Sequence, residues 1–161
     1  MIIVDNTKIE FYRLLNRQLA ELLDGHTNMI TNLSQCSAFL NTYLKDINWV
    51  GFYLTQPDGN LLLGPFQGLV ACVAIELGRG VCGTAAKTRE TQLVADVHAF
   101  PGHIACDARS QSEIVCPIVV NDKVIGVLDI DSPSLNRFDE QDAEGLMALV
   151  KTLIDKTEFP Q

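Results

Sequence analysis

Two amphipathic segments open the chain. Apolar residues recur every three or four positions over residues 9–23, with charged residues between them, and the pattern stops at Gly25. A second apolar stripe covers residues 29–44, where Thr27 or Asn28 can cap the start of a helix. The sequence therefore predicts two helices, and we expect both of them to lie against a sheet.

From Trp49 onward the pattern changes to short apolar runs broken by turn residues, which is typical of strands. Runs at 49–54 and 61–66 flank the turn sequence Pro-Asp-Gly-Asn and predict an antiparallel hairpin. The β-prone runs 113–120 and 124–130 are joined by Asn-Asp-Lys and predict a second hairpin. The other predicted elements are a strand over 71–77, a short glycine-opened helix over 81–88, a strand over 93–95 and a last helix over 138–156 with Asp139 and Asp142 placed as a capping box.

Residues 96–112 have neither a strand period nor a helix period, and a loop this long inside a compact domain is usually functional or disordered. Helices, two hairpins and a closing helix, in that order, predict the α+β fold class with a central, mainly antiparallel sheet rather than alternating βαβ units. With 161 residues, the chain has the length of one domain. We expect residues 1–161 to form a single domain with a core at about 7–154.

Charge and composition narrow the function classes. The net charge is −8 and no run of Lys or Arg is present, which disfavours nucleic acid and anionic membranes as partners. No apolar stretch approaches the ~18 residues of a membrane span, and the start lacks the features of a signal peptide, so we expect a cytoplasmic protein. His98 and His103 lack a third ligand at metal spacing, and the glycines match no nucleotide-binding fingerprint. No metal and no bound cofactor is therefore expected.

The cysteines are the nucleophiles that the sequence places most suggestively: Cys36, Cys72, Cys82, Cys106 and Cys116. Cys36 lies on a helix stripe and Cys116 inside an apolar strand, so both are expected to be core residues. Cys106 lies within the irregular segment, where a side chain can reach a bound molecule. Cys72 and Cys82 flank a strand and a glycine turn, and each can be either a core residue or a resolving thiol.

Acidic and aromatic residues form a second candidate group. Asp129 and Asp131 are two apart on a predicted strand and share one face, which is costly unless a cation, a hydrogen-bond donor or water meets them. They belong either to a strand end that frays into solvent or to a pocket for a cationic group. Trp49 and Tyr53 also share a strand face, either as core residues or as the wall of that pocket, and Glu113 opens the strand after the irregular segment.

Several stretches taken together resemble one family closely: DINWVGFYL, LGPFQG, GRGVCGTAA, DVHAFPGHIACDARSQSEIV and VIGVLDIDSP. They are similar to the GAF-domain free methionine-(R)-sulfoxide reductases, over nearly the whole chain. The resemblance implies a single GAF domain and the reduction of free methionine-(R)-sulfoxide, with recycling by thioredoxin, no bound cofactor and possibly a homodimer. It further implies Cys106 as the nucleophile, Cys72 as the usual resolving cysteine and Cys82 as a third redox-active cysteine.

The same resemblance implies that Trp49 and Tyr53 form the aromatic wall of the substrate pocket and that Glu113, Asp129 and Asp131 are its carboxylates. Physically, the sulfur of a sulfoxide becomes a usable electrophile when its oxygen is protonated, so the thiolate needs an acid beside it. Glu113 is the candidate acid, which requires its pKa to be raised by burial or by neighbouring negative charge. Asp129 and Asp131 can supply this charge and can pair with the ammonium of a free amino acid.

What would activate the thiol of Cys106 stays open between loop N–H groups and His103, because Asp107 and the acidic pair disfavour a thiolate. Two other functions remain: a ligand-sensing GAF module without turnover, and a thiol peroxidase or redox switch. The chain ends soon after Lys156 with no sign of an output domain, which disfavours the sensor. Trp49 and the acidic residues disfavour the peroxidase, because peroxide needs no ammonium site.

Overall fold

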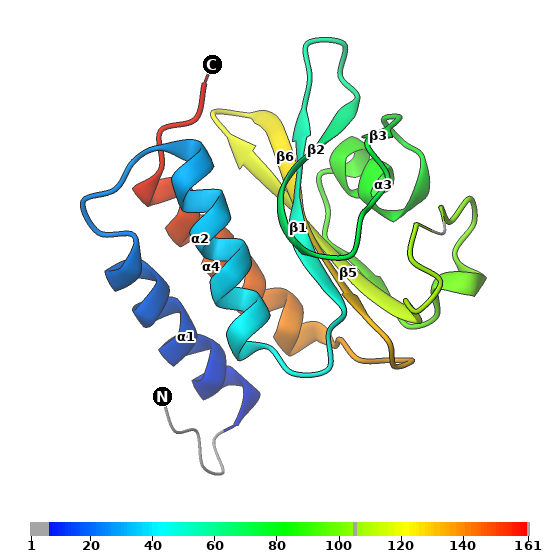
Figure 1. Ribbon diagram of the computed structural model, residues 1–161, viewed down its shortest axis with the longest axis horizontal. Helices are drawn as coiled ribbons and strands as arrows, with labels where there is room; N and C mark the ends of the chain where they lie inside the picture. The colour runs from blue at the N-terminus through cyan, green and yellow to red at the C-terminus, as the bar shows by residue number, and fades with distance from the viewer. Residues whose placement is uncertain (1–6, 105, 161) are drawn as a thin grey trace.

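Within the part of the chain that the structure describes, four α-helices and six strands make up the fold (Figure 1). The computed structural model describes residues 7–104 and 106–160. Its elements are α1 (Lys8–Leu22), α2 (Met29–Tyr43), β1 (Trp49–Thr55), β2 (Leu61–Gly68), β3 (Ala74–Ile75), α3 (Gly80–Thr88), β4 (Gln92–Val94), the 3-10 turn η1 (Val97–Ala99), β5 (Ser112–Val120), β6 (Lys123–Ser132) and α4 (Glu140–Lys156). Over this described part of the chain, no helix has the length and apolarity that crossing a membrane requires.

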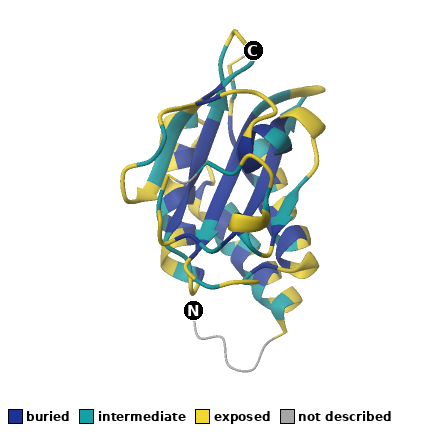
Figure 2. Cartoon of the chain, turned by 90° about the vertical axis from the view of Figure 1, so that its right-hand side faces the viewer, coloured by how far each residue is buried: buried dark blue, intermediate teal, exposed yellow. Residues whose placement is uncertain are grey.

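The six strands form one antiparallel sheet in the order β3-β2-β1-β6-β5-β4. Both predicted hairpins are present, β1 with β2 and β5 with β6, and β1 joins β6 to connect them. The α+β fold class with a mainly antiparallel sheet is therefore confirmed. The central strands are almost entirely buried, as the view onto the sheet shows (Figure 2).

The sheet separates two hydrophobic cores. The larger core lies between the sheet and helices α1, α2 and α4, and the smaller one lies between the opposite face and helix α3 with its flanking loops (Figure 1). α2 packs on β1 and β2 as expected, but the expectation that α1 also lies against the sheet is wrong, because α1 packs mainly on α4. Gly145 of α4 makes this packing close, since a Cβ at that position would collide with the ring of Tyr12.

The helix ends follow the predicted capping chemistry. The side chain of Asn28 accepts a hydrogen bond from the N–H of Thr31, which decides between the two candidate caps of α2. At α4, the carboxylate of Asp139 accepts from the N–H of Asp142, and the carboxylate of Asp142 accepts from the N–H of Asp139. The predicted capping box is therefore confirmed.

Some predicted boundaries are wrong. The apolar run at 71–77 pairs as a strand only at Ala74–Ile75, and the last helix begins at Glu140 rather than at residue 138. The strand predicted at 93–95 is shifted by one residue, to Gln92–Val94. The irregular segment contains the turn η1, capped by Asp96, and ends where β5 begins at Ser112.

A β-bulge in the second hairpin sets the register that matters most for the site. The hairpin turns at Asn121 and Asp122, both with positive φ, so that Val120 lies opposite Lys123. The register shifts by one residue between Ile118 and Val119, and from there the pairing brings Glu113 opposite Asp131. Without the shift, Glu113 would face the larger core.

Candidate active site

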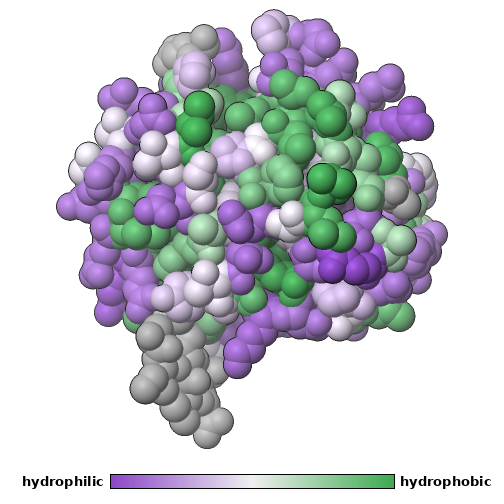
Figure 3. Space-filling model, in the orientation of Figure 1, coloured by the Kyte–Doolittle hydropathy of each residue, from purple (hydrophilic) through white to green (hydrophobic). Residues whose placement is uncertain are grey.

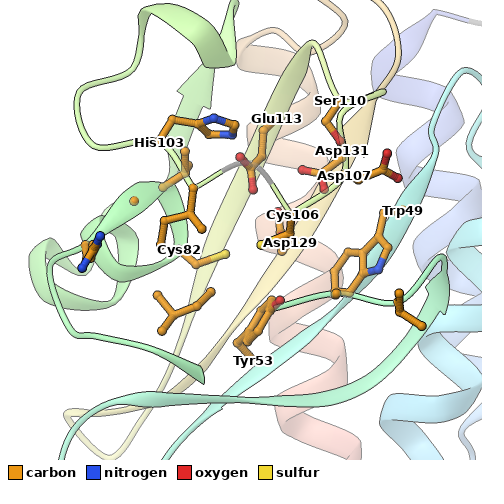
Figure 4. A pocket seen from close by; sticks show the side chains of 17 residues that line it. Trp49, Tyr53, Cys82, His103, Cys106, Asp107, Ser110, Glu113, Asp129 and Asp131 are labelled. Atoms are coloured by element: carbon orange, nitrogen blue, oxygen red, sulfur yellow. The ribbon is translucent and has the colours of Figure 1, made fainter. Parts of the chain in front are cut away.

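Three carboxyl groups meet on the sheet face opposite helices α1, α2 and α4. Asp131 of β6 lies between Trp49 on β1 and Glu113 on β5, and Asp129 is two residues earlier on the same strand (Figure 4). Glu113 and Asp129 are 6% and 5% exposed. β6 continues to Ser132, which is fully buried, so the strand does not fray into solvent at the aspartates. The pocket interpretation is the one that the structure supports.

Burial raises the pKa values of the three carboxyl groups and so favours their protonated forms. Desolvation raises the pKa of Glu113 well above its ordinary value, and the negative charges of Asp129 and Asp131 raise it further. The pKa of Asp131 is also raised well above its usual range, first by burial and then by the charge of Asp129. The pKa of Asp129 is raised less, because hydrogen bonds from Glu113 and Cys82 oppose the effect of burial. The shift of Glu113 is in the direction that a proton donor requires.

An aromatic wall borders the carboxyl groups. The ring of Trp49 is stacked against Tyr53 at 5.9 Å and against Phe66 at 5.2 Å between centroids. Two glycines make room for this ring: a Cβ would lie 2.8 Å from it at Gly51 and 2.5 Å from it at Gly68. The indole of Trp49 is thus packed between its neighbours and lines the pocket (Figure 4).

The wall also holds the segment that carries Cys72. The indole N–H of Trp49 donates to the carbonyl of Leu69 at 3.1 Å, and the hydroxyl of Tyr53 donates to the carbonyl of Cys72 at 2.9 Å. Aromatic residues that line the pocket therefore also position one of its cysteines.

Three of the five cysteines gather at this pocket. Cys72 and Cys106 form a disulfide with a Cα–Cα distance of 5.6 Å. Cys82, in the first turn of α3, is free and buried. Cys36 and Cys116 lie in the larger core on the other side of the sheet, as the sequence predicts for them.

The thiol of Cys82 lies beside the buried acids. Its sulfur and the carboxylate oxygens of Glu113 and Asp129 lie within 4.8 Å of one another, and burial together with the charge of Asp129 raises the pKa of its thiol well above the ordinary value. Among the described residues these three offer the donor set closest to a metal site. The raised pKa values of Glu113 and Cys82 mean that protons occupy these donors and compete with a metal ion.

The loop that carries Cys106 is tied to the sheet by polar contacts that sequence reasoning missed. The amide nitrogen of Asn48 donates to the carboxylate of Asp107 and to the hydroxyl of Ser110, both at 3.1 Å. The N–H of Asn48 donates to the carbonyl of Asp131. Since Asn48 stands one residue before Trp49 on β1, it links the Cys106 loop directly to the pocket. The one sequence feature that could have pointed to Asn48 is its position directly before Trp49 of the aromatic wall.

The charges next to Cys106 differ from those expected. The guanidinium of Arg109 forms hydrogen bonds with Asp107 and, with help from Asn48, lowers the pKa of that carboxyl to about 2. Asp107 is therefore ionised, but its charge is matched by Arg109. His103 also lines the pocket, and burial lowers the pKa of its imidazole, so it is neutral at pH 7.

Comparison with known proteins is consistent with this arrangement. Residues 34–153 match the GAF domain family. The free methionine-R-sulfoxide reductase of Escherichia coli is 54% identical over 91% of this chain and 88% of its own length, and that of Saccharomyces cerevisiae is 52% identical over 84% and 79%. This chain belongs to the GAF-domain family of free methionine-R-sulfoxide reductases.

Solved structures of the free methionine-R-sulfoxide reductase family share the fold. The Neisseria meningitidis enzyme in complex with its substrate has a TM-score of 0.91 and 41% identity, covering 97% of this chain and 93% of that one. The structure of fRMsr of Staphylococcus aureus in complex with substrate has a TM-score of 0.87 and 54% identity, covering 96% and 99%.

The site residues that the sequence points to line one pocket, with one exception, Cys72, which lies just outside the lining. The residues that line it are Trp49, Tyr53, Cys82, Cys106, Glu113, Asp129 and Asp131. The sequence did not point to Ser110, Arg79 or Ile104, which also line it. Ser110 and Ile104 belong to the irregular segment, whose path no periodic pattern could predict.

Proposed function

We propose that this protein reduces free methionine-(R)-sulfoxide to methionine, with Cys106 as nucleophile and Glu113 as general acid. One observation carries the proposal: Cys106, which is disulfide-bonded to Cys72, lines one pocket together with a buried carboxyl cluster and an aromatic wall. Relatives that are named for this activity share about half of their residues with this chain.

In the first step, the Cys106 thiolate attacks the sulfoxide sulfur while Glu113 protonates the sulfoxide oxygen. The oxygen is then transferred to the sulfur of Cys106: the S–S bond made by the attack and the S–O bond of the substrate break, a new S–O bond forms at Cys106, methionine leaves, and Cys106 is left as a sulfenic acid. The thiol of Cys72 then displaces this oxygen as water and forms the disulfide. Thioredoxin, as the external dithiol, returns both sulfurs to thiols, so that the chemistry needs no bound cofactor and no metal.

Substrate selection rests on charge in this proposal. The cluster of Asp129 and Asp131 binds the ammonium group that a free amino acid carries and a residue within a peptide lacks. The face of Trp49 packs on the methyl sulfoxide end. Cys82 serves as the third redox-active thiol. We further propose that the protein is a homodimer, which sedimentation tests, and that it is cytoplasmic, which cell fractionation tests.

A coupled assay decides the proposal. NADPH consumption with thioredoxin and thioredoxin reductase is measured with free methionine-R-sulfoxide, with the S epimer and with a peptide that contains methionine sulfoxide. Turnover is expected for the free R epimer alone, and Cys106→Ser is expected to abolish it. Cys36→Ser is the matched control, because that thiol is buried in the other core, and it is expected to retain activity.

Retained turnover in Cys106→Ser would remove the nucleophile from the proposal. Binding of the sulfoxide without turnover in the unsubstituted protein would favour the ligand-sensing module instead. Rapid reduction of hydrogen peroxide without reduction of the sulfoxide would favour the peroxidase.

A further inference from the structure

The segment between β2 and β3 exposes apolar side chains on both sides of Cys72. Leu69, Val70 and Val73 are 55%, 88% and 64% exposed. Single exposed apolar residues are ordinary, but three of them flank one redox-active cysteine here. The space-filling view shows hydrophobic surface gathered on this part of the molecule (Figure 3). We call residues 69–73 the strap.

The strap is fixed in place by its backbone. The carbonyls of Leu69 and Cys72 accept hydrogen bonds from Trp49 and Tyr53, and the carbonyl of Val73 accepts from the N–H of Leu63 at 2.9 Å. These bonds use the carbonyl groups and leave the side chains of Leu69, Val70 and Val73 exposed, although Val70 and Ala71 also line the pocket. The exposed apolar surface is therefore formed before any partner arrives.

Charge is absent from this part of the chain. No Asp, Glu, Lys or Arg occurs between Asn60 and Glu76 in the sequence, although the chain as a whole carries a net charge of −8. Depletion of charge together with exposed apolar side chains is the composition found at the centre of protein interfaces. A small soluble reductant would have no use for such a surface.

The two sulfurs of the disulfide differ in their surroundings. Cys106 lines the pocket together with Cys82 and Glu113, whereas Cys72 is not part of the pocket lining. A thiolate attacks a disulfide in line with the S–S bond, from the side opposite the leaving sulfur. Cys72 lies within the strap itself, between the exposed side chains of Val70 and Val73, so a partner seated on the strap lies beside the sulfur of Cys72.

We propose that the strap is the docking surface for a protein dithiol of the thioredoxin class, which attacks the sulfur of Cys72. This inference rests on the proposed function, since it concerns how the disulfide of that reaction is reopened. The partner's thiolate bonds to the sulfur of Cys72, and the S–S electron pair leaves on Cys106, which becomes the nucleophile again. The partner's second thiol then displaces Cys72, so that the partner ends as a disulfide and this chain as two thiols.

The test separates docking from chemistry. The double variant Leu69→Asp/Val73→Asp places two charges on the strap, and Ile30→Asp is the control, because Ile30 is 65% exposed on α2, on the other side of the sheet. Methionine formation is measured in a single turnover of the pre-reduced protein, in steady state with dithiothreitol, and in steady state with thioredoxin, thioredoxin reductase and NADPH.

The double variant is expected to lose at least tenfold in kcat/KM for thioredoxin and to keep its single-turnover and dithiothreitol rates, while Ile30→Asp keeps all three rates. Equal kcat/KM for thioredoxin in the double variant and the unsubstituted protein would overturn the docking surface. Turnover with dithiothreitol but none with thioredoxin would overturn the partner class. Absence of methionine even in the single turnover is the result that contradicts the proposed function itself.

The direction of attack has its own readout. A thioredoxin in which the second active-site cysteine is replaced by serine is mixed with the oxidised protein, and the trapped mixed disulfide is mapped by peptide mass spectrometry. The bond is expected at Cys72. A bond at Cys106 would overturn the assignment of the attacked sulfur.

Discussion

Replacing Glu113 by glutamine is expected to change how the stability of the protein depends on pH. The folded protein keeps the Glu113 proton, because burial and the charge of Asp129 raise the pKa of this carboxyl well above its ordinary value of 4.5. The unfolded chain loses that proton near the ordinary value. Above pH 4.5 the folded state therefore binds more protons than the unfolded state, and the free energy of unfolding falls as the pH rises.

The size of this effect follows from proton linkage. One proton held by the folded state alone lowers the free energy of unfolding by about 1.4 kcal/mol for each pH unit. Glutamine is uncharged in both states and has nearly the same shape as protonated glutamic acid. Between pH 5 and pH 7 the stability of Glu113→Gln is therefore expected to increase by roughly 3 kcal/mol relative to that of the unsubstituted protein.

Urea unfolding of the disulfide-bonded protein, followed by the fluorescence of its one tryptophan, Trp49, measures both curves. His103, whose pKa burial lowers, contributes a slope of opposite sign, but it is present in both proteins and cancels in the difference. Glu90→Gln, at an exposed position, is the control for the substitution and is expected to follow the unsubstituted protein. Parallel curves for Glu113→Gln and the unsubstituted protein would refute the argument, because they would mean that Glu113 is already ionised in the fold.

Three further substitutions test other parts of the structure. Asp139→Ala removes the capping box of α4 and is expected to lower the free energy of unfolding by about 1 kcal/mol, measured by urea unfolding. Gly51→Ala makes a Cβ collide with Phe66 on β2 and brings it to 2.8 Å from the indole of Trp49; it is expected to destabilise by about 1–3 kcal/mol and to raise KM, since β2 and the aromatic wall must shift. Asp131→Ala is expected to raise KM for the free sulfoxide with a smaller change in kcat, and an unchanged KM would remove its part in binding the ammonium.

The sequence predicts the shared face of Asp129 and Asp131, because two residues on one strand keep the period of two wherever the strand lies. It cannot predict that Glu113 joins them. Counting back from the hairpin turn, with Val120 opposite Lys123, places Glu113 opposite Ile130 and thus on the wrong face. The bulge between Ile118 and Val119 corrects this by one residue, and no turn signal or apolar pattern marks it.

The strand predicted over 71–77 is wrong for a different reason. The run is apolar and of strand length, yet only Ala74 and Ile75 pair with β2, and Val73 is exposed to solvent. Pattern analysis assumes that apolar side chains are inside, so it fails where a surface is apolar for a reason other than folding. The contacts of Asn48 were missed because they join residues about 60 positions apart in the sequence, which no local pattern records.

The sheet acts as a partition between two populations of thiols. The side chains of Cys36 and Cys116 are 2% and 0% exposed in the larger core, on the face of the sheet opposite the sulfenic acid expected at Cys106. A chain with five cysteines could in principle form ten different disulfide pairs, but the partition leaves only the three thiols of the pocket side within reach of one another. The sulfenic acid that forms at Cys106 can therefore condense within the chain only with Cys72 or Cys82. The protein can then cycle between its thiol and disulfide states without forming disulfides to Cys36 or Cys116.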